Sequence, residues 1–149
     1  MSSRMLVTGG AGFIGSHLVD ALLAAGCTVR VLDNLSTGCR QNLEEFGGDV
    51  ELVVGDIRDR DMLDRCCRNI DTVFHLAAFI SVPGSVEDPE AADSVNITGT
   101  LQTLLSARDS GVRRVVFSSS AAVYGEPREL PVVETAPTRP ASRAAMNLN

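Results

Sequence analysis

A glycine-rich turn near the N-terminus reads Thr8-Gly9-Gly10-Ala11-Gly12-Phe13-Ile14-Gly15. It directly follows a β-rich run at residues 4–8 and opens a helical pattern in which apolar residues recur every fourth position. Glycine permits a tight turn at position 9, lets a phosphate approach the backbone at position 12, and allows close helix–strand packing at position 15. The helix N-terminus adds free N–H groups and partial positive charge. The turn therefore predicts a pyrophosphate site that includes Phe13 and Ile14.

Strand-like and helix-like segments alternate beyond this turn. β-rich runs recur at residues 28–33, 50–55, 71–77 and 113–118, and helical patterns lie around residues 40–46, 59–68 and 88–111. Asp88 and Pro89 suit a helix start, and Gly26 and Gly111 suit helix ends. The pattern predicts an α/β fold with a Rossmann-type, doubly wound parallel sheet of five strands in the order 3-2-1-4-5. The last two strands do not alternate polar and apolar residues, so we expect both of their faces to be buried.

The character of the chain changes after residue 120. Four prolines and many polar residues at 125–142 predict a long loop. The 149 residues are enough for one domain with its own core. We therefore expect a dinucleotide-binding domain at residues 1–120, followed at 121–149 by a loop and a truncated or divergent C-terminal tail.

Acidic residues end the second and third predicted strands. Asp33, followed by Asn34, is placed to accept hydrogen bonds from the adenosine ribose and to repel a 2′-phosphate, which favours NAD over NADP. Arg30 and Arg40 keep NADP open as an alternative, and a solvated strand-end carboxylate is the structural alternative for Asp33.

Residues that follow the third strand and end the fourth add further predicted cofactor contacts at the carboxyl edge of the sheet. Asp56 is placed to accept from the adenine amino group, with Ile57 packing on the ring, although helix capping is an equal alternative for Asp56. Ala77 and Ala78 end the fourth strand with small side chains that leave room for a cofactor. His75, just before them, is better explained as a core histidine than as a catalyst.

Composition limits the partners. Thirteen basic against nineteen acidic side chains give a net charge of −6, which argues against nucleic acid and anionic membranes. No apolar run approaches the ~20 residues of a membrane span, and no signal peptide is evident. The four cysteines lack metal-ligand spacing, so we expect reduced thiols, no metal and a cytoplasmic protein. The adjacent Cys66 and Cys67 fit one buried helix stripe with Leu63 and Ile70.

Several motifs occur together in one order along the chain. They are Gly9-x-x-Gly12-x-x-Gly15, Asp33-Asn34, Asp56-Ile57, His75-Leu76-Ala77-Ala78, Asn96 with Gly99-Thr100, and Ser118-Ser119-Ser120-Ala121-Ala122-Val123-Tyr124-Gly125. This set resembles the extended short-chain dehydrogenases/reductases, and within them the NAD-dependent epimerases/dehydratases, most of all the bacterial UDP-glucose 4-epimerase group. The resemblance covers residues 4 to about 142. It implies NAD as cofactor and a nucleotide-sugar substrate, with dTDP-glucose dehydratase and UDP-N-acetylglucosamine epimerase chemistry as close alternatives.

The resemblance also implies a hydride transfer at C4 of the sugar, assisted by a serine and by a Tyr-x-x-x-Lys pair. Ser120 matches the serine, and Asn96 and Ser118 match positions near the cofactor. The pair is missing, because Ala144 and Leu148 stand at the expected positions and the sequence contains no lysine. Tyr124 matches a different position beside the serine run.

Three interpretations follow from this missing pair. The chain is a truncated or frameshifted product of an epimerase-type gene, a non-catalytic NAD-binding or regulatory module, or an inert fragment. We expect negligible epimerase activity from it alone. The family helix that follows Tyr-x-x-x-Lys is also absent, so we expect partly bare apolar residues near Val73, Phe74, Val116 and Phe117, and self-association or dependence on a partner.

Overall fold

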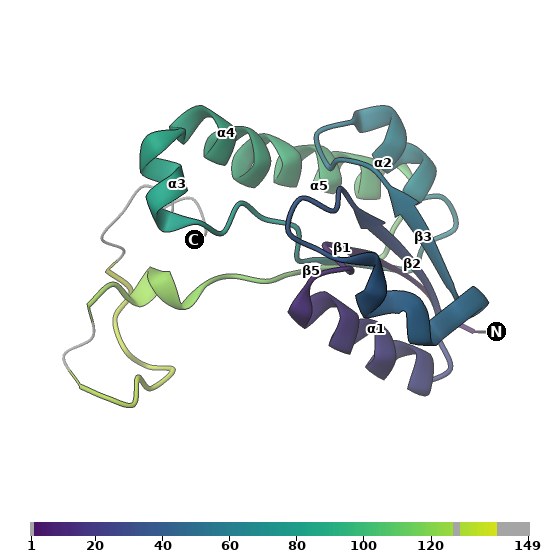
Figure 1. The fold of residues 1–149 in the computed structure, drawn as a ribbon, viewed down its shortest axis with the longest axis horizontal. Coiled ribbons are helices and arrows are strands. Elements are labelled where there is room, and N and C mark those ends of the chain that lie inside the picture. Colours follow the sequence, from purple (N-terminus) through teal and green to yellow (C-terminus); the bar gives the residue numbers. More distant parts are fainter. Residues whose placement is uncertain (1, 127–128, 140–149) are drawn as a thin grey trace.

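A computed structural model of the chain describes residues 2–126 and 129–139 and contains an open parallel sheet (Figure 1). Its strands lie in the order β3-β2-β1-β4-β5, and every neighbouring pair is parallel. Their bounds are β1 (Arg4–Thr8), β2 (Thr28–Asp33), β3 (Val50–Val54), β4 (Thr72–His75) and β5 (Arg114–Phe117). The predicted Rossmann-type doubly wound sheet is therefore confirmed.

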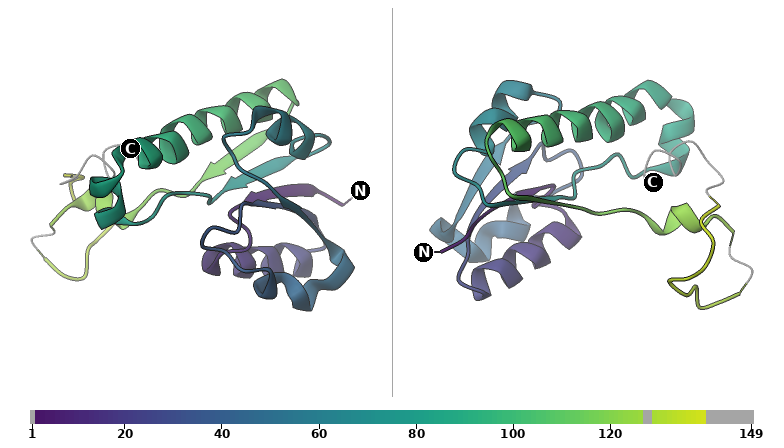
Figure 2. Two further views of the ribbon diagram at one scale, coloured as in Figure 1. Left: turned by 45° about the horizontal axis from the view of Figure 1, so that its top comes forward. Right: turned by 180° about the vertical axis from the view of Figure 1, so that it is seen from behind.

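Helices cover both faces of the sheet (Figure 2). One face carries α1 (Phe13–Ala24) and the 3-10 segment η1 (Arg40–Asp49), and the other carries α2 (Arg60–Cys66) and α5 (Thr100–Asp109). The chain between β4 and α5 forms α3 (Val82–Glu87), α4 (Pro89–Asp93) and the π-helical turn η2 (Ser94–Gly99), and η3 (Ala121–Tyr124) follows β5.

Each face of the sheet has its own apolar core. The α1 side is built around Val7, Val19, Val29, Val31 and Leu43. The α2 and α5 side is built around Leu6, Leu32, Leu63, Val73 and Ala107, together with Cys66, Cys67 and Ile70. The predicted buried stripe of Cys66 and Cys67 is confirmed, and all four cysteines are free thiols. Burial of both faces explains why β4, which lies between two other strands, reads as a continuous apolar run.

Capping residues explain where the helices begin and end. Asp59 accepts a hydrogen bond from Met62 N at the start of α2, and Asp88 accepts from Ala91 N at the start of α4. Gly26 and Gly111, with φ of 77° and 74°, end α1 and α5. The predicted helix at 88–111 is confirmed, although η2 interrupts its regular turns.

Helix α3 was not predicted. Its signal in the sequence is Ser81, whose side chain accepts from Gly84 N, with Pro83 in the first turn.

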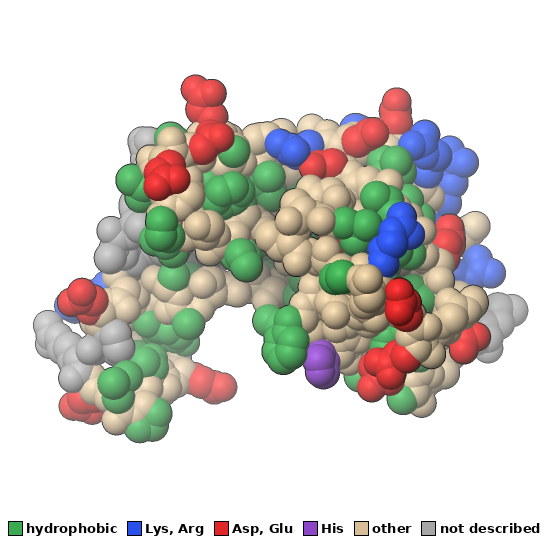
Figure 3. Space-filling model, viewed as in Figure 1, with side chains coloured by type: hydrophobic (Ala, Val, Ile, Leu, Met, Phe, Trp, Pro, Cys, Tyr) green, Lys and Arg blue, Asp and Glu red, His purple; other side chains and the backbone are tan. Residues whose placement is uncertain are grey.

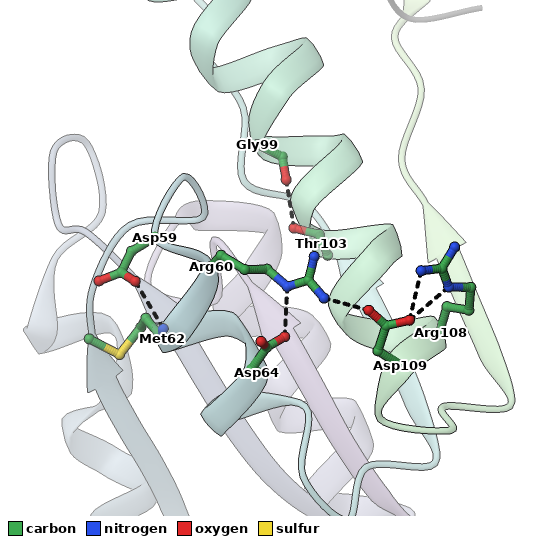
Figure 4. A network of polar contacts seen from close by, with 8 residues as sticks. All are labelled: Asp59, Arg60, Met62, Asp64, Gly99, Thr103, Arg108 and Asp109. Carbon is green, nitrogen blue, oxygen red and sulfur yellow. Dashed lines mark hydrogen bonds and ion pairs between the residues drawn. The ribbon is translucent and has the colours of Figure 1, made fainter.

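An arginine joins α2 to α5 (Figure 4). Arg60 lies 2.8 Å from Asp64 on its own helix and 2.6 Å from Asp109 on α5. Arg108 pairs with the same Asp109. These side chains are partly exposed, so solvent screens their charges and each pair contributes little to stability. They fix the register of two helices that already pack through the core.

The prediction that β5 is buried on both faces is wrong. β5 is the edge strand, and Val116 and Phe117 are 40% and 41% exposed because no helix in the described part of the chain covers them. The expected exposure of these two residues is thus confirmed. The expectation for Val73 is wrong, because it is fully buried, whereas Phe74 is half-buried against the α1-side core.

The chain leaves the sheet after β5 and forms a separate extension (Figures 1 and 2). Residues 129–139 contain no helix or strand, as predicted, and Arg139 N donates to Val123 O of η3. The outline of the molecule is hollowed between this extension and the body that carries the sheet (Figure 3). Within residues 2–126 and 129–139, no helix is both long and apolar enough to cross a bilayer.

Candidate dinucleotide site

The glycine turn lies between β1 and α1, in the centre of the sheet. Gly9 has φ of 72°, a left-handed conformation that glycine adopts without strain, and its N–H donates to Leu32 O over 2.9 Å. A Cβ at Gly9 would lie 2.7 Å from Ala77 N, so the turn rests directly on the chain that leaves β4. The predicted need for glycine at this position is confirmed.

Gly12 and Gly15 do different things. A Cβ at Gly15 would overlap Gly9 O and come within 2.6 Å of Gly10 Cα, so this glycine allows helix and turn to pack. At Gly12 the only atom within 4 Å of a built Cβ is Gly9 O, at 3.3 Å. Gly12 is the N-cap residue of α1, and no side chain of the described residues caps this helix. The N–H groups of its first turn therefore have no side-chain acceptor among the described residues, as expected of a helix N-terminus that binds a phosphate.

Large apolar side chains flank this position. Phe13 and Ile14 are 79% and 67% exposed although they open a helix whose other face is buried. The Phe13 ring contacts the His17 ring, with centroids 4.8 Å apart. The structure thus brings both predicted residues beside the turn.

Asp33 is tied to the glycine turn. It is 7% exposed, and its carboxylate accepts from Ala11 N at 2.9 Å and from Leu35 N at 2.8 Å. The interpretation of Asp33 as a solvated strand-end residue is therefore wrong. A carboxylate oxygen accepts two hydrogen bonds, so each oxygen keeps capacity for a further donor such as a ribose hydroxyl.

The carbonyl of Ala11 is held as firmly as its N–H. Cys39 N donates to it over 3.0 Å and Asn42 Nδ2 over 2.8 Å. The sequence analysis did not identify Asn42. Its signal is weak, because a polar residue in a short helical segment has no sequence spacing that links it to a turn 31 residues away.

Asp56 takes part in an ion pair at the ends of β2 and β3. Arg58 donates to it from its backbone N, Nε and Nη2, and Asn34 Nδ2 donates from 3.0 Å. These bonds, those of the Arg58 side chain above all, hold the Asp56 pKa well below its usual value. Asp59 caps α2, so the helix-capping alternative for Asp56 is wrong.

Ile57 lies in the core, only 5% exposed. A Cβ at Gly99 would lie 2.6 Å from Ile57 Cδ1, so its side chain packs beneath η2. This differs from the expected packing of the Ile57 side chain on an adenine ring, because the apolar surface of α5 competes for it. Any cofactor role of Ile57 remains a prediction.

His75 belongs to a buried polar chain below the turn. Thr8 Oγ1 accepts from Leu76 N and Ala77 N and therefore donates to His75 Nδ1, 2.8 Å away. His75 Nε2 then carries the proton and donates to Thr100 Oγ1 over 3.0 Å. Burial lowers the His75 pKa to about 4. The prediction of a core histidine is confirmed.

The residues after β4 carry the predicted alanines. Ala77 is half-buried against the turn, and Ala78 is exposed. Asn96, 7% exposed, uses both ends of its amide on one residue of this segment: Phe79 N donates to Oδ1 at 2.8 Å, and Nδ2 donates to Phe79 O at 3.1 Å. The structure therefore shows Asn96 holding the chain rather than projecting into an open site.

The serine run lies at the exit of β5. Ser118 N donates to His75 O over 3.2 Å, which continues the strand pairing. Ser120 Oγ accepts from Ala122 N over 3.1 Å and so caps η3. The expected Tyr and Lys positions, Ala144 and Leu148, lie outside the described residues.

A parallel sheet with a glycine turn on its central strand, an uncapped helix N-terminus and an acid on the next strand defines a Rossmann-type nucleotide-binding protein. The profile of the GDP-mannose 4,6-dehydratase family matches residues 6–145. The chain belongs to this family.

Known relatives agree in fold. The chain is 48% identical, over 94% of its length, to UDP-glucose 4-epimerase of Streptomyces lividans. It is 46% identical to Thermus thermophilus UDP-glucose 4-epimerase in complex with NAD, with a TM-score of 0.87 over 97% of this chain. It is 40% identical to dTDP-glucose 4,6-dehydratase from Streptomyces venezuelae with NAD bound, with a TM-score of 0.87 over 97%. The chain spans only 43%, 47% and 48% of these three proteins.

Proposed function

We propose that this chain is the NAD-binding portion of a nucleotide-sugar epimerase or dehydratase of the UDP-glucose 4-epimerase type. The observation that carries the proposal is the open, uncapped N-terminus of α1 at Gly12, with the Asp33 carboxylate bound to the same turn. A diphosphate would accept from the first-turn N–H groups, and Asp33 would accept from a ribose hydroxyl. The dinucleotide, when bound, supplies hydride transfer.

NAD is favoured over NADP on electrostatic grounds. A 2′-phosphate would meet the buried Asp33 carboxylate. Arg30 cannot offset that repulsion, because it donates to Glu51 at 2.8 Å and to Cys66 O at 2.7 Å. Arg40 is exposed and keeps NADP as the alternative.

Catalysis needs more than these residues provide. We propose that Ser120 hydrogen-bonds the reacting sugar oxygen in the complete active site. A phenol with a pKa near 10 works as a base at neutral pH only beside a positive charge, and this sequence has no lysine and only one tyrosine. We further propose a dinucleotide-binding domain at residues 1–120, followed at 121–149 by a loop and a truncated or divergent C-terminal tail.

A titration tests the binding half of the proposal. Calorimetry with NAD should give saturable 1:1 binding, NADP should bind at least about tenfold more weakly, and Asp33→Ala should lose at least about tenfold in NAD affinity. An Asp20→Ala variant, altered on the exposed side of α1, should bind as the parent does. Absence of NAD binding by the folded parent would refute the proposal.

An enzymatic assay tests the catalytic half. Interconversion of UDP-glucose and UDP-galactose should stay at background for these 149 residues, and turnover above background would contradict the missing-base argument. A non-catalytic NAD-binding or regulatory module is the second candidate, favoured by the absence of lysine. A longer chain that supplies Tyr-x-x-x-Lys and remains inactive would favour that module.

Location and assembly are part of the same proposal. Four free thiols suit a reducing, cytoplasmic location. Exposed Val116 and Phe117 at the sheet edge favour self-association or a partner segment that covers them. The substrate that the complete protein would take is a nucleotide-sugar, as in the relatives.

A further inference from the structure

The turn η2 touches the carboxyl ends of two strands on opposite sides of the glycine turn. Asn96 binds the backbone of Phe79 after β4, and Thr100 accepts from His75 at the end of β4. Gly99 approaches Ile57, after β3, so closely that a Cβ would lie 2.6 Å from Ile57 Cδ1. Five consecutive residues therefore contact both borders of the candidate site.

The Asn96 side chain makes the pair of hydrogen bonds that a neighbouring β-strand would make with one residue. Its amide accepts from Phe79 N and donates to Phe79 O, as a neighbouring strand would, at a point where β4 has already left its pairing with β1. Asn96 is 7% exposed, so water competes poorly for these bonds. The segment after β4 is held by a side chain instead of by a strand.

The glycine turn depends on that segment. Gly9 lies against Ala77, where a Cβ would come within 2.7 Å of the backbone N. Thr8 Oγ1 accepts from Leu76 N and Ala77 N, which ties the first residue of the turn to the same stretch. A shift of residues 76–79 would therefore move the turn that we assign to the diphosphate.

We infer that η2 and the first residue of α5 form a positioning element, in which Asn96 and Thr100 hold the segment after β4, and through it the glycine turn, in the geometry that binds the dinucleotide. The inference rests on the proposed NAD site and gives Asn96 a role other than direct contact with the cofactor. A wide π-helical turn suits this role because it breaks the regular helical spacing and lets nearby side chains reach different strands.

Amide exchange in the ligand-free protein tests the contact itself. Asn96→Ala should speed exchange of the Phe79 amide by about tenfold or more relative to Val31 in the sheet centre, because the N–H loses its acceptor. Asn96→Asp keeps an acceptor, so this exchange should stay within about threefold of the parent. Unchanged Phe79 exchange in Asn96→Ala would overturn the inference.

NAD affinity tests the positioning role. Asn96→Ala and Thr100→Val should each weaken NAD binding by about fivefold or more, whereas Thr100→Ser, which keeps the hydroxyl, should restore it. Thr98→Ala, exposed on the same turn, should have no effect. Ala107→Gly, which destabilises α5 without touching these contacts, should lower the melting temperature and leave NAD affinity unchanged.

The outcomes separate the two proposals. Faster Phe79 exchange in Asn96→Ala with unaltered NAD affinity overturns the positioning role and leaves the proposed function standing. A parent chain that binds no NAD overturns both the proposed function and the positioning role, even where the exchange data show the contact. Loss of affinity in Ala107→Gly equal to that in Asn96→Ala also overturns the inference, because general destabilisation would then explain both.

Discussion

The backbone N–H of Ala11 donates a 2.9 Å hydrogen bond to the carboxylate of Asp33, which lies 22 residues further along the chain. The acid at the end of β2 is therefore part of the glycine turn as well as a candidate ribose ligand. Asp33 also accepts from Leu35 N, so it organises both the turn and the loop after its own strand. Its removal should affect folding and binding together.

Asp33→Ala should destabilise the protein by about 1–3 kcal/mol, because two N–H groups at a buried site lose their acceptor. Urea unfolding followed by circular dichroism measures this, with exposed Asp20→Ala as the neutral control. Parental stability in Asp33→Ala would show that the Ala11 contact contributes nothing to the fold.

Two glycine substitutions should separate binding from folding. Gly12→Ala places a methyl group 3.3 Å from Gly9 O, on the side where the phosphate is expected, and a small shift of that carbonyl accommodates it, so stability should change by less than about 1 kcal/mol while NAD affinity falls at least about tenfold. Gly15→Ala should instead destabilise the fold by about 1–3 kcal/mol, because its methyl group would overlap Gly9 O. Gly48→Ala, with nothing within 4 Å, is the control for both. Equal effects of the first two substitutions on stability would contradict this division.

His75 should make stability depend on pH. Burial lowers its pKa to about 4 from an ordinary 6.5, so the unfolded chain binds more protons between these values. The contribution of neutral His75 to the free energy of unfolding is complete above pH 6.5 and is lost as the pH falls toward 4. The total loss is about 3 kcal/mol. Urea unfolding at intervals from pH 7 to pH 4.5 should show this decline, and His75→Gln should remove most of it. The ion-paired Asp64, Asp71 and Asp109 have pKa values below their ordinary 3.8. The stabilisation that their ionised carboxylates provide is therefore lost only at lower pH.

The cysteines should differ sharply in reactivity. Cys39 is exposed, whereas Cys66 and Cys67 are buried, and burial raises the Cys67 pKa to about 11. A disulfide reagent at pH 8 should modify Cys39 first and the buried pair only at the rate of unfolding. Cys39→Ser should abolish the fastest phase. A fast phase that survives this substitution would place another thiol at the surface.

The exposed edge at β5 should promote self-association. Val116→Thr keeps the side-chain shape and removes apolar surface at a position that is 40% exposed, so it should shift the chain toward monomer in light scattering. Val86→Thr on α3, at a residue 77% exposed and away from the sheet, is the matched control. A monodisperse monomer for the unsubstituted chain would remove the basis for this prediction.

Local features of the sequence were sufficient for the fold and for the position of the glycine turn within it. The glycines at 9, 12 and 15, the apolar strands and the cap at Asp88 act within a few residues of their position. Their conformational demands can therefore be recognised without knowing any distant contact. Strand order followed from the preference for right-handed crossovers, which holds for almost any chain of this pattern.

Only the tertiary structure decided what the polar side chains bind. Asp33 and Asn96 matched cofactor positions in the sequence. In the structure the Asp33 carboxylate accepts from Ala11 N, and the Asn96 amide binds the backbone of Phe79. Ile57 was expected at an adenine ring and lies in the core under Gly99. A buried polar or apolar group takes whichever partner the folded chain brings nearest, and that partner is set by strand order and helix packing rather than by spacing along the sequence.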